Sequence, residues 1–191
     1  MDFFKKITNP FNHSKQQPSF TQEGGSEKEK EISSDIVLPT LQIEPRTAEQ
    51  YHFKMAASGI SPNEWIEDMI DNMPALHGPT TLKLKVMSVD DLGLDHAATT
   101  AEIYARAKEM GMSLCPAQVG PELLLQYFHD QSLETLEFLK VAMESIKDGS
   151  GSENVFQVIF TPGKGADLAA DHGFMVKPHH IHEKFIFTVS E

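Results

Sequence analysis

The sequence predicts an α+β fold built on a mostly antiparallel sheet with one main packing helix. From Leu123 to the C-terminus, short runs with apolar residues at every second position follow one another, and residues typical of tight turns lie between several of them. One strong helical pattern, over residues 99–110, precedes these runs. Because strands joined by short turns pair antiparallel, this helix is expected to cover one face of their sheet.

Residues 1–35 are expected to form a disordered tail. From Ser14 to Asp35 the chain consists mostly of Ser, Gln, Glu, Lys and Gly, and its few apolar side chains do not offset the entropy lost on ordering. The opening residues, MDFFKKITNPFNH, place Phe and Ile beside two lysines but are interrupted by Pro10. They lack the continuous apolar segment of a secretory signal.

Residues 36–78 predict a strand followed by a helical hairpin. Leu41 and Ile43 alternate with polar residues, as in a short half-buried strand. Thr47 and Gln50 have the spacing of a capping box, which begins a helix, and Gly59 is typical of a helix end.

The second helix of this hairpin has the clearest start signal in the chain. Ser61 is placed to cap it, Pro62 to occupy its first turn and Glu64 to complete the capping box. Apolar residues then recur at helical spacing and form the face expected to be buried: Trp65, Ile66, Met69, Ile70 and Met73. Pro74 ends the helix.

Residues 79–191 are expected to form the α+β domain. A strand, TTLKLKVMS, comes first, and the main helix follows with Thr99 or Thr100 as its cap and Gly111 at its end. The buried face of that helix is predicted to contain Ile103, Ala107 and Met110. Five further runs predict strands: LLLQYF, LEFLKVAMESI, VFQVIF, GFMVK and EKFIFTV. A tight turn with Asp-Gly at 148–149 favours a hairpin between the second and third of them.

The chain is acidic, with a formal net charge of −12. Residues 1–45 hold five Lys and seven acidic residues, so most of the negative charge belongs to the part expected to fold. An acidic domain repels the phosphate backbone of nucleic acids, and the pair Lys83 and Lys85 is the nearest approach to a basic patch. We therefore expect no nucleic-acid partner. No apolar stretch approaches the length of a membrane span.

Cys115 is the only cysteine, so the chain forms no internal disulfide. This favours a reducing compartment, and we expect a cytoplasmic protein. The neighbouring residues offer no base or cation to lower the pKa of the thiol. Because Pro116, Gly120 and Pro121 are turn residues, the segment predicts a buried corner that leads from the main helix into a strand.

His180 and His182 form a candidate metal site. On an extended segment, residues two apart share one face, and two imidazoles at that spacing can bind zinc. Asp171, His172, His179 or Glu183 would complete the ligand set. The alternative is a solvent-exposed histidine cluster that follows the turn at Pro178. Zinc is the cofactor that this pattern allows, and no other is indicated.

Residues 41–73 also have the element order of a ribbon-helix-helix module, in which paired strands of a dimer enter the DNA major groove. The polar face of the strand would present Thr40, Gln42 and Glu44. None of these carries the positive charge that contacts with phosphate or guanine require. The same elements are equally suited to dimerisation or to packing against the sheet.

The segment TTAEIYARAKEMGMSLCPAQVGPELLLQY, followed by FLKVAMESI and NVFQVIF, resembles a small domain of uncharacterised bacterial proteins. In that family a helix leads into the motif Leu-Cys-Pro-x-x-Val-Gly-Pro, and then into a strand that ends in Gln-Tyr. An Ala-Met-Glu strand and a Val-Phe hairpin follow. The resemblance covers roughly residues 82–189. It implies the fold and a bacterial origin, and it implies no activity.

The sequence favours a non-enzymatic protein-binding or accessory module, because no residues form a recognisable catalytic constellation. Trp65 and Tyr127 are the residues expected to contact the partner, which is expected to be a protein. A homodimer is also compatible with the sequence. Sheet residues would add an apolar patch: Phe138, Met143, Phe156, Phe160, Phe174 and Met175. Two alternatives stay open: a metal-dependent enzyme that uses the histidine cluster, and a dimeric DNA-binding regulator.

Overall fold

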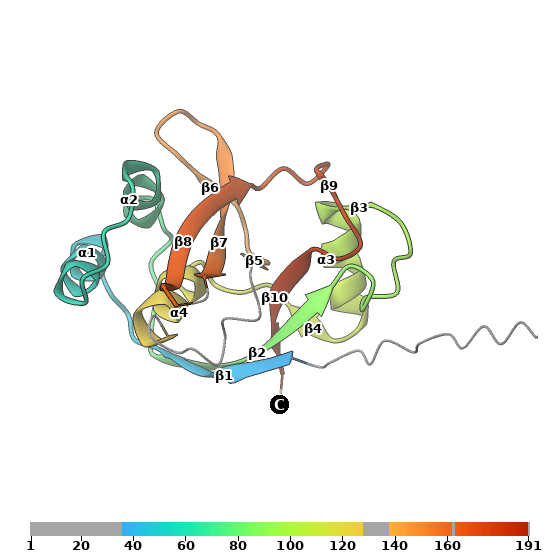
Figure 1. Cartoon of the computed structure of the whole chain (residues 1–191), viewed down its shortest axis with the longest axis horizontal. Helices are drawn as coiled ribbons and strands as arrows, with labels where there is room; N and C mark the ends of the chain where they lie inside the picture. The colour runs from blue at the N-terminus through green and yellow to red at the C-terminus, as the bar shows by residue number, and fades with distance from the viewer. Residues whose placement is uncertain (1–35, 128–137, 162, 191) are drawn as a thin grey trace, which may run out of the picture. The chain divides into compact units, whose positions relative to one another are not determined.

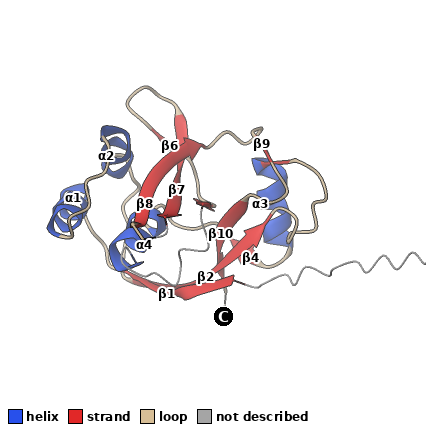
Figure 2. Cartoon of the chain, viewed as in Figure 1, coloured by secondary structure: helices blue, strands red, loops and turns tan. Residues whose placement is uncertain are grey.

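The computed structural model describes residues 36–127, 138–161 and 163–190. It confirms the α+β class, because in these segments helices pack against a mixed, mostly antiparallel sheet (Figures 1 and 2). The tail expected over residues 1–35 lies outside the described residues.

The described helices and strands alternate along the chain. In order, they are β1 (Ile36–Ile43), α1 (Ala48–Ala57), α2 (Glu64–Asp71), β2 (Thr80–Ser88), β3 (Ala98–Thr99), α3 (Thr100–Glu109), β4 (Met112–Ser113), α4 (Val119–Tyr127), β5 (Phe138–Val141), β6 (Ile146–Lys147), β7 (Glu153–Thr161), β8 (Gly165–His172), β9 (Pro178–His179) and β10 (Lys184–Val189). None of the helices in the described segments is long and apolar enough to cross a membrane.

The main sheet has the strand order β1-β2-β10-β5-β7-β6, with β8 paired to β7 and β4 paired to β10. β10 and β5 run parallel, and the other pairs of labelled strands are antiparallel. β3 and β9 form a separate two-stranded sheet. The C-terminal strand β10 therefore lies between β2 and β5, and it joins segments that are far apart in the sequence.

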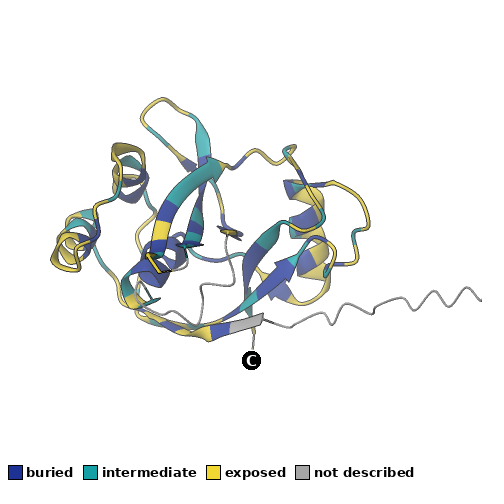
Figure 3. Ribbon diagram, viewed as in Figure 1, coloured by how far each residue is buried: buried dark blue, intermediate teal, exposed yellow. Residues whose placement is uncertain are grey.

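The two faces of the sheet bury two separate apolar clusters. On β10, Phe185 and Phe187 belong to the cluster that contains Ile103 and Ala107 of α3. Ile186, between them, belongs to the larger cluster, which includes α1, α2 and α4. This alternation is the period-two pattern of a strand buried on both faces (Figure 3).

β1 and the helical hairpin share the core of the main sheet. β1 pairs antiparallel with β2 over most of its length. Thr47 and Gln50 form the predicted capping box at the start of α1. α2 begins later than predicted, because Asn63 rather than Ser61 caps it, with its side chain accepting the N–H of Ile66 at 3.0 Å. All described residues belong to one compact unit.

The main helix α3 has the predicted ends. Thr99 caps it through a capping box with Glu102, and Gly111 follows its last turn with a positive φ of 81°. That left-handed conformation suits glycine, which has no Cβ. Met110 was predicted on the buried face of the helix, but it is 44% exposed because it lies at the C-cap.

The prediction of a strand for LLLQYF was wrong, because residues 123–127 of this run lie in α4, and its last residue is outside the described segments. Leu123 and Leu124 are adjacent and both fully buried, which a strand exposed on one face does not allow. α4 packs against β1, β7 and β8, so its apolar side chains find neighbours around most of the helix. Gly120 makes this packing close: a Cβ there would lie 2.7 Å from Cβ of Phe156.

The prediction of a strand for GFMVK was also wrong. Residues 173–177 form a loop that connects β8 to β9. Its local structure is a turn, in which the N–H of Lys177 donates to the carbonyl of Phe174 at 3.0 Å. Apolar composition alone does not distinguish such a loop from a strand, since no neighbouring strand is visible in the sequence. Figure 3 shows most of this connection as exposed.

Candidate functional site

A cluster of charged side chains lies where β5, β8 and the segment before β10 meet. At its centre is Lys140 of β5, whose Nζ is 2.6 Å from Oδ2 of Asp171 and 2.5 Å from Oε2 of Glu183. The same nitrogen is 3.3 Å from Nδ1 of His179. Lys177 forms a second ion pair with Asp171. Two of the three ammonium protons of Lys140 therefore have a carboxylate acceptor within reach.

The cluster is charged at neutral pH. Burial by itself raises the pKa of Asp171 and of Glu183, but hydrogen bonds outweigh it, and both pKa values fall to about 2. For Lys140, burial lowers the pKa, yet its bonds to the two carboxylates raise it above the ordinary value. A nucleophilic lysine needs a lowered pKa, so Lys140 is a structural cation rather than a reactive amine.

His179 connects this cluster to the first residue of α3. Its Nε2 is 2.9 Å from Oγ1 of Thr100, and its Nδ1 is 2.9 Å from Oε2 of Glu183. Hydroxyl, imidazole and carboxylate in this order are also the parts of a catalytic triad. However, Thr100 is 4% exposed and His179 is 3% exposed, so the hydroxyl offers no open approach to a substrate. The three residues instead link the start of α3 to β9 and to the segment before β10.

The imidazole of His179 is neutral in this arrangement. Burial lowers its pKa, and the positive charge of Lys140 lowers it further, while the hydrogen bond with Glu183 acts in the opposite direction. The shorter of the two contacts at Nδ1 is with Glu183, so we assign the proton to Nδ1. Nε2 then accepts the hydroxyl proton of Thr100.

The low carboxylate pKa values predict an acid-sensitive cluster. In the folded chain, the pKa values of Asp171 and Glu183 are about 2, below their ordinary values of 3.8 and 4.5. The unfolded chain therefore binds more protons in this range, and the stability present above pH 4.5 is lost as the pH falls toward 2. We expect a loss of roughly 1 kcal/mol for each carboxylate, because partial exposure screens both.

Urea unfolding at pH values between about 6 and about 2.5 measures this loss. The double variant Asp171→Asn, Glu183→Gln lacks both titrating groups, so its free energy of unfolding should change less over the same pH range. If the variant and the parent chain lose the same free energy on acidification, other carboxylates cause the acid sensitivity.

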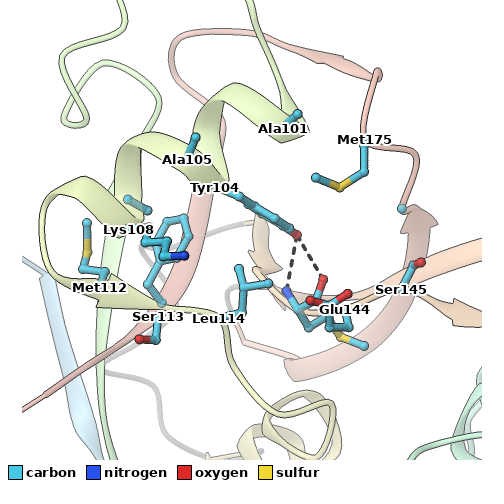
Figure 4. Close-up of a pocket in the computed structure, with 14 residues that line it drawn as sticks. Ala101, Tyr104, Ala105, Lys108, Met112, Ser113, Leu114, Glu144, Ser145 and Met175 are labelled. Atoms are coloured by element: carbon cyan, nitrogen blue, oxygen red, sulfur yellow. Dashed lines mark hydrogen bonds between the residues drawn. The ribbon is translucent and has the colours of Figure 1, made fainter.

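A pocket of about 580 Å³ lies between α3 and the segments 143–145 and 173–175 (Figure 4). Ala101, Tyr104 and Ala105 line it on the helix side, and Met143 and Met175 line it opposite. Volumes of this size are typical of sites for small molecules.

Tyr104 reaches from α3 across this pocket (Figure 4) and contacts the backbone of Met143. Its hydroxyl donates to the carbonyl of Met143 and accepts the N–H of the same residue, both at 3.3 Å. Burial raises the pKa of Tyr104 to about 12. The phenol therefore stays protonated and positions the segment 143–145, rather than acting as a base.

Three consecutive apolar side chains are exposed in the loop 173–177 beside this pocket. Phe174 is 45% exposed, Met175 48% and Val176 81%. Backbone hydrogen bonds hold the loop in place, since its carbonyl groups at 175 and 177 accept N–H groups of Ala101 and Thr100 at 2.9 and 3.0 Å. The ion pair of Lys177 with Asp171 fixes the end of the loop.

An aromatic row continues this surface toward α2. The ring centroids of Trp65 and His172 are 6.5 Å apart, and those of His172 and Phe174 are 5.7 Å apart in a stacked arrangement. Trp65 is 44% exposed. We call Trp65, His172, Phe174, Met175 and Val176 the docking surface. Trp65, predicted to be buried in α2 and also to contact a partner, lies in it.

The candidate metal ligands His180 and His182 lie between β9 and β10, and both are exposed. They line a second pocket, of about 530 Å³, together with Lys140 and Glu183. In the described segments, no group of three or more His, Cys, Asp or Glu side chains is placed to hold a metal ion. Zinc binding by this pair stays a prediction.

The other residues singled out in the sequence are mostly structural. Tyr127 is half-buried, and its hydroxyl donates to the carbonyl of Thr40 at 3.3 Å, which links α4 to β1. Cys115 is buried, as predicted; burial raises the pKa of its thiol, which donates to the carbonyl of Ile186. The corner at Cys115 leads into α4, however, and not into a strand.

The expected apolar patch on the sheet is divided by the fold. Met143, Phe156 and Phe160 are buried in the core. Phe174 and Met175 are exposed in the docking surface, and Phe138 is 56% exposed beside the second pocket.

Comparisons with models of protein families, with curated proteins and with solved structures give no match. The function is therefore inferred from the chemistry of the described surface. Sequence reasoning named Asp171, His179 and Glu183 as possible metal ligands, but it missed that Lys140 joins them, and it missed the exposed loop. The cluster had one signal: Lys140 lies inside the apolar run FLKVA, and a charge at a buried strand position requires partners.

Proposed function

We propose that the protein is a recognition module that binds a short segment of another protein through the docking surface. One observation carries this proposal: Phe174, Met175 and Val176 are exposed on a loop that backbone hydrogen bonds hold in place. Exposed apolar side chains grouped in one patch mark interaction sites. Because the loop is already ordered, little conformational entropy is lost when a partner binds.

The pocket beside α3 supports an anchored mode of binding. Met175 belongs both to the docking surface and to the pocket lining, so a partner that covers the loop also reaches the pocket. An apolar side chain of the partner would enter it and pack against Ala101 and Ala105. Interfaces commonly concentrate their binding energy in one such buried anchor.

The negative charge of the chain indicates that the partner segment is positively charged. α2, which supplies Trp65, has the acidic residues Glu64, Glu67, Asp68 and Asp71 and no basic residue. Glu144 is exposed and lines the pocket. With a net charge of −12, the chain attracts a cationic partner and repels anionic lipid and nucleic acid. The partner is therefore a segment with apolar and basic side chains.

The ribbon-helix-helix alternative has less support from the geometry. β1, the strand that would enter DNA, pairs with β2 of the same chain. Arg46, which follows it, is paired with the buried Glu122. Neither feature supplies the cationic surface that binding to DNA needs.

A peptide-binding experiment tests the proposal. Peptides of about ten residues that combine apolar and basic side chains are selected against the full chain, and their affinities are measured by fluorescence anisotropy. We expect dissociation constants on the order of micromolar. The variant Phe174→Ser, Val176→Ser should weaken binding by about tenfold or more, because it removes apolar contact area.

The matched control is the variant Phe53→Ser, Met110→Ser. Phe53 is 74% exposed and Met110 is 44% exposed, but neither belongs to the docking surface. Equal weakening in the control, or selection of acidic peptides, would contradict the proposal. Self-association of the parent chain that disappears in the Phe174→Ser, Val176→Ser variant would also contradict it, since a second copy would then be the occupant.

A further inference from the structure

Nitrogen-bearing side chains dominate the described lining of the pocket that contains His180 and His182. Besides the two imidazoles, the lining includes Lys140, Lys184 and Gln157. In β-sheet register, Lys140 of β5 lies directly opposite Gln157 of β7, which brings ammonium and amide donors to neighbouring positions. Such a set of donors is suited to bind a group with several acceptor oxygens.

Three of these side chains have no acceptor in the described part of the chain. No hydrogen bond or ion pair there involves the side chain of His180, His182 or Lys184. Glu183, the one carboxylate in the described lining, already has hydrogen-bond partners at both of its oxygens. Its Oε2 contacts Lys140 and His179, and its Oε1 accepts the N–H of His180 at 2.9 Å.

The charges around the pocket favour an anion over a metal cation. The described lining contains two lysines, Lys140 and Lys184, and one carboxylate, Glu183, so it has an excess of one positive charge. This excess occurs in a chain with a net charge of −12. A divalent cation between the two histidines would be repelled by the ammonium groups that share their pocket.

We propose that this pocket binds the phosphate group of a small ligand. The donors are His180, His182, Lys184 and the amide of Gln157, while Lys140 contributes its charge. Donors from four residues can each reach a different oxygen of a phosphate group, which has more oxygens than a carboxylate. This site is separate from the docking surface and does not depend on the function proposed above.

Phe138 gives the ligand a second chemical feature. Its ring lines the same pocket and is 56% exposed, so an aromatic face lies beside the phosphate donors. A ring attached to the phosphate would stack on it. The site therefore favours a phosphate ester that carries a planar group over free phosphate.

Titration of the full chain with inorganic phosphate, followed by NMR at constant ionic strength, tests the site. We expect saturable shifts of the backbone amides in residues 180–184, with sodium chloride producing none. The variant His180→Ala, His182→Ala and the variant Lys184→Ala should each weaken binding by at least about fivefold, since each removes donors to a charged group. The control variants His77→Ala and Lys164→Ala, both at exposed positions outside the pocket, should bind as the parent chain does.

Titration with phenyl phosphate distinguishes a site for the free phosphate ion from a site for an aromatic phosphate ester. If it binds more tightly than inorganic phosphate, and Phe138→Ala removes the difference, the ligand is an aromatic phosphate ester. Equal affinities would support a site for the free oxyanion. Shifts that do not saturate, or that persist in the His180→Ala, His182→Ala variant, would overturn the proposal. Stoichiometric zinc binding that this variant abolishes would overturn it as well, in favour of a metal site.

Discussion

Replacing Lys140 by Met is expected to lower the free energy of unfolding by about 3–5 kcal/mol, which is a large part of the stability of an ordinary domain. The variant keeps the length of the side chain but leaves Asp171 and Glu183 without their shared cation. Both carboxylates are at most about one quarter exposed, so water replaces Lys140 only in part. Urea unfolding monitored by far-ultraviolet circular dichroism measures the change.

Two comparisons separate this effect from a general loss of charge. Lys164→Met removes an exposed lysine from the turn between β7 and β8, and it should change the stability by less than about 0.5 kcal/mol. The triple variant Lys140→Met, Asp171→Asn, Glu183→Gln should recover part of the lost stability, because the two carboxylates that lose Lys140 are then replaced by neutral amides. If Lys140→Met unfolds at the same urea concentration as Lys164→Met, the charged cluster does not stabilise the fold.

Replacing Glu122 by Leu is expected to cost about 3 kcal/mol of stability. Glu122 is 1% exposed on α4 and forms an ion pair with Arg46, which precedes α1. Its oxygens also accept hydrogen bonds from the hydroxyl of Tyr51 at 3.1 Å and the amide of Gln126 at 2.8 Å. Loss of the carboxylate leaves three donors without this acceptor and weakens the attachment of α1 to α4.

The matched control is Glu109→Leu, which removes the same type of pair from an exposed position. Glu109 lies 3.0 Å from Arg106, but its side chain is 67% exposed. Exposed pairs contribute at most about 1 kcal/mol, so Glu109→Leu should have a much smaller effect. Thermal unfolding by calorimetry compares the two. Similar losses of stability in both variants would show that burial of Glu122 adds nothing to the strength of its ion pair.

The ends of α1 and α3 could be predicted because their signals are local. Thr47 and Gln50 form the capping box at α1, and Thr99 forms the one at α3, within three residues of each other in sequence. The hydrogen bonds of a cap join neighbouring residues, so the sequence contains both partners. The strands β2, β7 and β10 were recognisable for a similar reason, since their apolar residues alternate.

The candidate sites were predictable only in part. Trp65 was expected to contact a partner and lies in the docking surface, and His180 and His182 were expected together and line one pocket. Phe174 and Met175 were expected in an apolar patch, but on a strand of the sheet. The loop over residues 173–177 was not predicted, because an apolar run indicates a strand until its neighbours are known. The ion pairs of Lys140 join residues more than thirty positions apart, and no local pattern indicates them.

The sequence by itself determined the fold class, the acidic charge, and the ends of α1 and α3, because composition and neighbouring residues are sufficient for these properties. Only the tertiary structure decided that residues 119–127 form a helix, that residues 173–177 form an exposed loop, and that Lys140 meets Asp171, Glu183 and His179. Each of these depends on contacts between distant segments. The packing of the whole domain also buries these contacts, and ion pairs and hydrogen bonds are electrostatically stronger in the interior than in water.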